Sequence, residues 1–307
     1  MLHLFLSVAA IAVAGASITE NLRGSHQPVV KPFTLLGHTY ESHEHFIRSG
    51  KRCATKDVPS GNLADINKRL KEIERTLRRA VAIVVQVHWH VITSTGGDGA
   101  VPQSQVEAQL AVMNSDYASS AVFFELASYE VTVNNAWFDL EDQSPEEIAM
   151  KNALRVGTAA DLNIYSIANS DGILGWATFP SDAAGNLAYD GVVVDYRTLP
   201  GGSAAPYNLG ATMTHEAGHW MGLYHTFQDG CVADVNGGDE VADTPAVAEP
   251  NFGCPVGIDS CPGTTGGYAG LDNVRNYMDY TDDSCMDNFT PDQGTRMQSA
   301  WYAYRAN

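Results

Sequence analysis

Thr214-His-Glu-Ala-Gly-His-Trp-Met-Gly-Leu-Tyr-His225 is the stretch that decides the fold. His215 and His219 are four residues apart, so on a helix their side chains point the same way, one turn apart. Gly222 allows a sharp turn at the end of that helix, and the turn can bring His225 round as a third ligand. Three protein ligands with an open fourth position predict a catalytic zinc site, because structural zinc sites are closed.

The chemistry predicted for this zinc site is hydrolysis at a carbonyl group. Glu216 follows the first ligand and can reach a zinc-bound water without binding the metal itself. Zinc lowers the pKa of bound water toward 7, and Glu216 accepts a proton as the water attacks a carbonyl. A catalytically inactive binding module on the same fold is the alternative, and the intact Glu216 argues against it. An amidase acting on small molecules is a third interpretation.

Length and charge exclude several classes of protein. The chain has 307 residues, 44% of them hydrophobic, which suffices for a large domain with a real core. Its net charge of −18 is opposite in sign to that of a phosphate-backbone binder, so we expect no nucleic-acid partner. Residues 1–80 nevertheless hold 12 of the 18 bases and only 7 of the 36 acids. A basic leader on an acidic body suggests a segment that docks electrostatically and is later removed, although a solvated basic tail has the same composition.

The leader opens with an export signal. An apolar run from Leu2 ends at Ala14-Gly-Ala16, which predicts a secretory signal over residues 1–16. No other stretch approaches the ~20 apolar residues that cross a bilayer, so we expect a secreted, extracellular monomer with no membrane partner. We assign residues 17–60 to a pro-segment, whose end could lie as late as residue 79, and residues 61–307 to a catalytic domain. The candidate processing points are Lys51-Arg52, Lys68-Arg69 and Arg78-Arg79.

Secretion also changes how the five cysteines are interpreted. Cys231, Cys254, Cys261 and Cys285 can form two disulfides in an oxidising compartment, and their spacing does not choose among the three pairings. Cys53 is left over and lies in the basic leader. A stray or intermolecular thiol is one interpretation of it, and another comes from the resemblance described below.

Strand and helix patterns alternate along the middle of the chain. Strands are predicted at residues 82–92, 129–133, 162–167, 173–179 and 191–195, and helices at 63–77, 101–116 and from 144 onward. This alternation indicates an α/β arrangement with a largely parallel sheet. After residue 226 the chain is rich in Gly, Asp and Pro, and Thr290-Pro-Asp-Gln293 predicts the start of a closing helix.

The zinc motif resembles that of a known group. H-E-x-x-H-x-x-G-x-x-H is the metzincin signature, and metzincins also have a downstream Met-turn, which Asn276-Tyr-Met-Asp-Tyr280 supplies with Met278. Stretches such as Leu174–Pro180 and Gly238–Pro245 extend the match to the compact secreted branch of the pappalysin family, over residues 53–305. The resemblance implies an endopeptidase with a mixed α/β metzincin fold. Its upper subdomain would hold a twisted mixed sheet and two long helices, and its lower subdomain would be irregular and disulfide-linked, with a C-terminal helix.

The resemblance also implies roles for further residues. Tyr280 would help to stabilise the tetrahedral intermediate, and the strand 173–179 would pair with an extended peptide substrate. Asp239 and Thr244 would hold a structural calcium ion. The disulfides would be interlocked, as Cys231–Cys261 and Cys254–Cys285.

A last resemblance concerns latency. Arg52-Cys-Ala-Thr55 is similar to the Arg-Cys-Gly-Thr of related zymogens, whose thiolate occupies the open zinc position. Cys53 is therefore expected to be a zinc ligand of the latent form, although the Cβ of Ala54 would hinder the close approach of the backbone to the cleft. Separately, Asn288-Phe-Thr290 is a glycosylation sequon.

Overall fold

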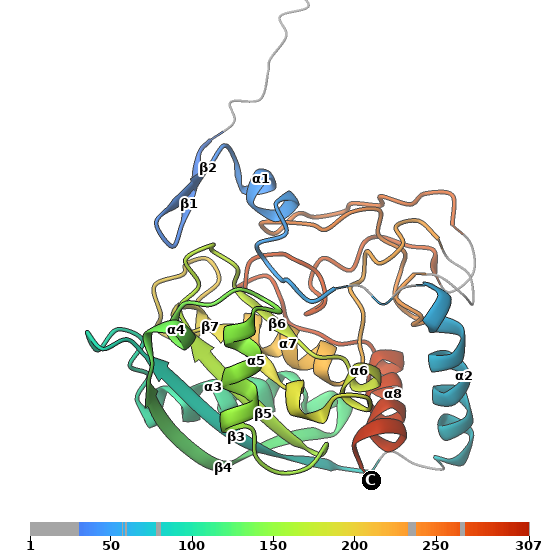
Figure 1. The fold of residues 1–307 in the computed structure, drawn as a ribbon. Coiled ribbons are helices and arrows are strands. Elements are labelled where there is room, and N and C mark those ends of the chain that lie inside the picture. Colours follow the sequence, from blue (N-terminus) through green and yellow to red (C-terminus); the bar gives the residue numbers. More distant parts are fainter. Residues whose placement is uncertain are drawn as a thin grey trace, which may run out of the picture. The chain divides into compact units, whose positions relative to one another are not determined.

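A five-stranded sheet organises the part of the chain that carries the histidines (Figure 1). We describe it from a computed structural model, which covers residues 31–306 except 57, 59, 78–80, 233–237 and 265–267. In spatial order the strands are β4 (Val122–Val133), β3 (Ile83–Thr93), β5 (Asp161–Ile167), β7 (Val192–Asp195) and β6 (Gly175–Ala177). The predicted signal over residues 1–16 and the pro-segment up to residue 30 lie outside the described residues.

The sheet is mixed, with one antiparallel strand at its edge. β3 pairs in parallel with both β4 and β5, and β5 pairs in parallel with β7. β6 runs antiparallel to β7, with Trp176 opposite Val193. The largely parallel sheet expected from the sequence is thus confirmed, and β6 is the edge strand that lies beside α7.

Helices cover both faces of this sheet (Figure 1). α3 (Gln103–Asp116) and α7 (Ala211–Trp220) pack on one face, where Val87 and Trp89 of β3 join Met113 in the main core cluster. α5 (Pro145–Leu154) packs on the other face, where Tyr165 and Ile167 of β5 contact the cluster around Met150. The Ser144 side chain caps α5 by accepting a hydrogen bond from Glu147 N. Pro145 is the first residue of the helix, a position where the missing N–H of proline costs no helical hydrogen bond.

The remaining helices and strands flank this core. They are β1 (Phe33–Leu35), β2 (His38–Tyr40), α1 (His43–Arg48), α2 (Ser60–Thr76), α4 (Asn135–Phe138), α6 (Pro180–Ala183) and α8 (Pro291–Ala300), which continues into the π-helical turn η5 (Trp301–Arg305). α8 begins with the capping box expected at Thr290 and Gln293. The apolar stripe of α2 packs Leu70 against Ala300 and Ala303.

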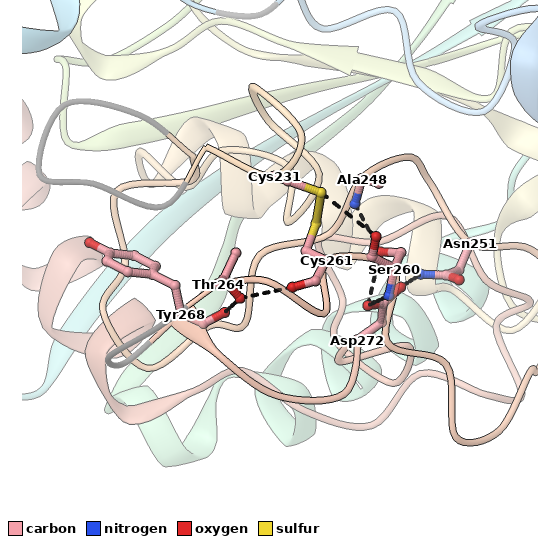
Figure 2. The surroundings of a disulfide bond; sticks show 8 residues. All are labelled: Cys231, Ala248, Asn251, Ser260, Cys261, Thr264, Tyr268 and Asp272. Carbon is pink, nitrogen blue, oxygen red and sulfur yellow. Dashed lines mark hydrogen bonds between the residues drawn. A yellow bond between two sulfur atoms is a disulfide. The ribbon is translucent and has the colours of Figure 1, made fainter.

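The segment between α7 and α8 has little regular structure and is held by disulfides. Cys231 pairs with Cys261 and Cys254 pairs with Cys285, the interlocked pairing that the resemblance implied. Figure 2 shows how the first disulfide is supported: Ser260 N and Oγ both donate to Asp272 Oδ1, while Ala248 N donates to Ser260 Oγ. Asn251 continues this network, because its Nδ2 lies 3.4 Å from Asp272 Oδ2 and 2.9 Å from Asp279 Oδ2 in the Met-turn.

Two predicted strand boundaries differ from the structure, and one stretch with no predicted element forms regular structure. β4 begins at Val122 rather than residue 129, because it pairs with β3 along its whole length and its outer side chains, such as Glu125, are exposed. β6 is shorter than 173–179, because Pro180 already begins α6. Residues 33–48, which show no periodicity in the sequence, form the β1–β2 hairpin and α1. Within the described ranges, no helix has the length and apolarity needed to cross a membrane.

Candidate active site

Three imidazoles converge at the end of α7. His215 Nε2 and His219 Nε2 are 3.1 Å apart, and His219 Nε2 is also 3.1 Å from His225 Nε2. All three side chains are buried. His225 reaches the other two because the chain turns at Gly222, whose φ of +96° favours glycine and whose added Cβ would lie 2.8 Å from Ala300 Cβ.

The outer nitrogens of two rings are held by backbone carbonyls. His215 Nδ1 donates to Tyr277 O at 2.6 Å and His219 Nδ1 donates to Leu223 O at 2.8 Å, because a carbonyl can only accept. This leaves each Nε2 with a lone pair that faces the other rings. Burial, followed by the neighbouring imidazoles, lowers the pKa of both rings well below the ordinary histidine value, so both are neutral and able to bind a metal.

These donors fit a zinc ion. Tetrahedral nitrogen ligands at about 2.05 Å from zinc lie about 3.3 Å from one another, close to the separations of the three Nε2 atoms. Lone pairs that converge in a buried site are unfavourable unless a cation lies between them, and the carbonyl partners of His215 and His219 are the usual outer contacts of metal ligands. The residues present can therefore hold zinc through His215, His219 and His225.

Glu216 lies beside this site and is fully buried, and its carboxylate is not one of the clustered ligand groups. Its Oε2 accepts from Thr55 Oγ1 at 2.9 Å, while its Oε1 accepts no hydrogen bond from the described residues. Burial raises the pKa of Glu216 to about 7. Gly175 of β6 lies directly above, since a Cβ there would be 2.9 Å from Glu216 Cγ. The Glu216 side chain therefore packs against the edge strand β6.

The Met-turn lies beneath the three histidines and forms the floor of the site. Met278 is fully buried, and a Cβ on Gly218 of α7 would lie 2.4 Å from its sulfur, so the turn packs directly beneath the helix. Tyr280 Oη is 3.1 Å from His225 Nε2. The hydroxyl that the resemblance assigned to the intermediate is thus brought to the histidine cluster.

Comparisons with known proteins agree with this geometry. The Peptidase M43 family model, described as pregnancy-associated plasma protein-A, matches residues 161–301. An extracellular metalloprotease of Verticillium alfalfae is 41% identical over 314 aligned residues, which cover 100% of both chains. This chain belongs to the pappalysin family. An extracellular metalloprotease of Podospora anserina is 47% identical over 233 residues, covering 74% of this pappalysin and 76% of the relative.

Two solved structures from Tannerella forsythia are similar to this pappalysin. A promirolysin mutant has a TM-score of 0.66 at 27% identity and covers 81% of this chain and 93% of that one. Mature mirolysin in complex with a cleaved peptide has a TM-score of 0.58 at 29% identity, and the match covers 71% of this chain and 91% of mirolysin. The protein is therefore a metalloprotease with the mixed α/β metzincin fold that the sequence predicted.

The segment around Cys53 lies in the active site of this pappalysin. The ligand atoms of Cys53, His215, His219 and His225 all fall within 4.8 Å of one another. Cys53 Sγ donates to Glu216 Oε2 at 3.4 Å, and burial raises the pKa of the thiol well above its ordinary value. Ala54 does not prevent this approach, because its N–H donates to Gly175 O of β6 at 3.0 Å.

Residues on either side of Cys53 dock as well. Arg52 is fully buried, and its Nη1 donates to Thr212 Oγ1 at 3.0 Å. Thr55 Oγ1 both donates to Glu216 and accepts from Ala177 N of β6. The sequence did not single out these partners, because nothing local in an arginine or threonine signals a contact more than a hundred residues away.

The calcium residues implied by the resemblance are buried with unused oxygens. Asp239 is 4% exposed and Thr244 is 1% exposed. Asp239 Oδ1 accepts from Val241 N, whereas Asp239 Oδ2 and Thr244 Oγ1 have no hydrogen-bond partner among the described residues. Burial raises the pKa of Asp239 to about 8. Oxygen donors of this kind suit a hard cation such as calcium.

The predicted sequon at Asn288 is half-buried behind the Met-turn. Asn288 O accepts from Tyr277 N, and Asn288 Nδ2 lies 3.0 Å from Asp287 Oδ1. Thr290 caps α8 through its hydroxyl. A glycan would replace one N–H of Asn288 Nδ2, so only one of its bonds to Asp287 Oδ1 and Asn273 Oδ1 could remain, and its occupancy stays a prediction.

Proposed function

We propose that this metalloprotease is a secreted, zinc-dependent endopeptidase that is made as a latent zymogen. The observation that carries the proposal is the convergence of His215, His219 and His225 beside a buried Glu216. The names of the relatives describe extracellular metalloproteases, and the two disulfides fit the same compartment.

Each residue of the site then has one role. Zinc, when held by the three histidines, supplies a Lewis acid that polarises the scissile carbonyl and lowers the pKa of water. Glu216 accepts a proton from the attacking water through Oε1 or Oε2 and returns it to the leaving amine. Tyr280 Oη donates to the oxyanion that develops on the scissile carbonyl. Met278 packs beneath α7 and keeps the floor of the site rigid.

Peptide substrates would bind along the edge of β6. The docked segment supports this, because Leu174 N donates to Lys51 O at 2.9 Å and Ala54 N donates to Gly175 O at 3.0 Å. An extended peptide that adds to a free sheet edge gains such main-chain bonds whatever its sequence. We infer an endopeptidase from this edge strand, which would accept a substrate once the leader is removed, and from the mirolysin neighbour, whose structure holds a cleaved peptide.

Latency would come from the leader, with Cys53 as fourth zinc ligand. Glu216 Oε2 is the acceptor for the thiol proton, and a bound metal favours the thiolate that burial alone disfavours. Farther upstream, Phe46 and Ile47 of α1 join Tyr207 and Tyr280 in one apolar cluster. The leader would therefore block the cleft through both a metal ligand and a packed helix.

The contacts of two candidate dibasic sites bear on our proposal for where the leader is cut. Arg52 is fully buried, and Arg69 lies inside α2 with its guanidinium bonded to Ala303 O and stacked over the Tyr304 ring. A protease needs an extended, accessible segment, so neither of these dibasic sites is offered while the leader is docked. We propose Arg78-Arg79, which lies outside the described residues, as the processing point, so that the pro-segment would end at residue 79 rather than 60.

Replacing Glu216 with alanine tests the reaction. The variant is expected to retain zinc, since the three histidines are unchanged, and to lose nearly all turnover of casein and of a fluorogenic peptide. His219→Ala is the matched control and should lose both zinc and activity. Turnover above about a tenth of wild type in Glu216→Ala would show that Glu216 is not the base. A zinc-loaded wild type that cleaves neither substrate would favour the inactive binding module.

We also propose that calcium binds at Asp239 and Thr244. Adding calcium chloride to calcium-depleted protein should raise its Tm, because a ligand that binds only the folded state stabilises it. Asp239→Asn should remove this rise, and an unchanged calcium response in that variant would place the ion elsewhere.

A further inference from the structure

Asp116 is a half-buried acid with no direct part in the proposed reaction, although it contacts both halves of the zinc site. Thr214 Oγ1 donates to its Oδ2 at 2.7 Å, and Tyr277 Oη donates to its Oδ1 at 2.8 Å. Thr214 belongs to α7 and Tyr277 to the Met-turn. One carboxylate thus bridges the helix that carries two histidines and the turn that lies beneath them.

The position of Asp116 in its own helix is unfavourable. It is the last residue of α3, and no basic residue occupies the last turn of that helix. A carboxylate at this end lies near the negative end of the helix dipole. The local sequence therefore gives no reason for an acid there, whereas the two hydroxyl groups do.

Both partners of Asp116 determine where the His215 ring lies. Thr214 immediately precedes His215, and the Thr214 carbonyl is fixed by a 2.7 Å bond from Tyr117 Oη. Tyr277 O accepts the 2.6 Å bond from His215 Nδ1, which sets the direction of the ring and leaves Nε2 for the metal. A shift of either segment would rotate the imidazole, since its backbone and its outer nitrogen are held separately.

We propose that Asp116 is a positioning residue that aligns His215 for zinc by tying Thr214 to Tyr277. The inference rests on the proposed zinc site and adds a contact from a third part of the chain. Asp116 hydrogen-bonds directly to both Thr214 and Tyr277. The packing of α7 on the Met-turn leaves little freedom, because a Cβ on Gly218 would overlap Met278 Sδ at 2.4 Å.

Zinc affinity tests the proposal independently of activity. Competition with a fluorescent chelator would be measured on the full-length chain in the Glu216→Ala background, which prevents self-cleavage. Asp116→Ala is expected to raise the zinc dissociation constant about tenfold, at the lower end of the effects seen when partners of metal ligands are removed. Thr214→Val and Tyr277→Phe should each give a smaller rise, and neither should add to Asp116→Ala, because the shared acceptor is already gone.

Tyr129→Phe is the matched control. It removes a tyrosine hydroxyl that donates to Val101 O at 2.8 Å, on the same side of the sheet but without contact to the histidines. Its zinc affinity should equal that of the parent, and a fall in its Tm like that of Tyr277→Phe would separate stability from zinc binding. Unchanged zinc affinity in Tyr277→Phe and Thr214→Val, or effects that add fully to Asp116→Ala, would overturn the proposal even if Asp116→Ala did not fold. A parent chain that bound no zinc would instead reject the proposed function.

Discussion

Arg52→Ala is expected to release activity from the uncut pro-form. The Arg52 guanidinium lies 4.9 Å over the Tyr207 ring, with Nη2 4.0 Å from Asp283 Oδ1, and both side chains of this pair are fully buried. Breaking a buried pair by removing one partner costs ~3–5 kcal/mol. Asp283 keeps its bonds from Leu209 N and Ala211 N, so the lower end of this range applies. At 1.4 kcal/mol for each factor of ten, the open fraction of the pro-form should rise about 100-fold.

The assay is turnover of a short fluorogenic peptide by pro-form whose intact mass shows no processing. Arg52→Lys is the control, because lysine keeps the charge but lacks the planar guanidinium group. The turnover of its uncut pro-form should lie between those of wild type and Arg52→Ala. A pro-form of Arg52→Ala as inactive as wild type would refute the reasoning. The docking of the leader would then depend on its other contacts alone.

Two further predictions concern the same leader. Cys53→Ser should also leak activity before any cleavage, because a serine hydroxyl is a far poorer zinc ligand than a thiolate; equal latency in the two pro-forms would make Cys53 a bystander. Burial lowers the pKa of His43 from 6.5, although Asp282 acts in the opposite direction. The docked state therefore favours the neutral ring, and docking should weaken as pH falls below 6.5. Pro-form turnover divided by mature-enzyme turnover should rise with acidity, and His43→Gln should flatten that profile.

The zinc ligands could be predicted because their geometry is local. His215, His219 and His225 lie within eleven residues, where helical periodicity and one glycine turn decide how they converge. The contacts that hold the site are not local. Arg52 meets Thr212 across 160 positions, and Asp116 meets Tyr277 across 161. Neither residue carries a motif, so only the folded chain could reveal these partners.

Strand prediction failed for a related reason. Only the second half of β4 is predicted as a strand. Its first half contains Ala127 and Ser128, which have low strand propensity, after the Phe124-Glu125 pair. Its length is set by β3, an inner strand with which it pairs from Ile83 onward. The β1–β2 hairpin and α1 likewise depend on partners that the linear pattern does not contain, since Phe46 packs against Tyr207.

The interlocked disulfides have a practical consequence for producing the enzyme. The irregular segment between α7 and α8 has little regular structure of its own and is held by Cys231–Cys261 and Cys254–Cys285. Asn251 and Asp279 link that segment to the turn beneath the histidines. The Met-turn residues Tyr277 and Met278 belong to the main core cluster, so loss of the disulfides in a reducing cytosol is expected to disturb the packing beneath the histidines. An oxidising secretory host, or refolding with a thiol–disulfide couple, is the appropriate route to active material.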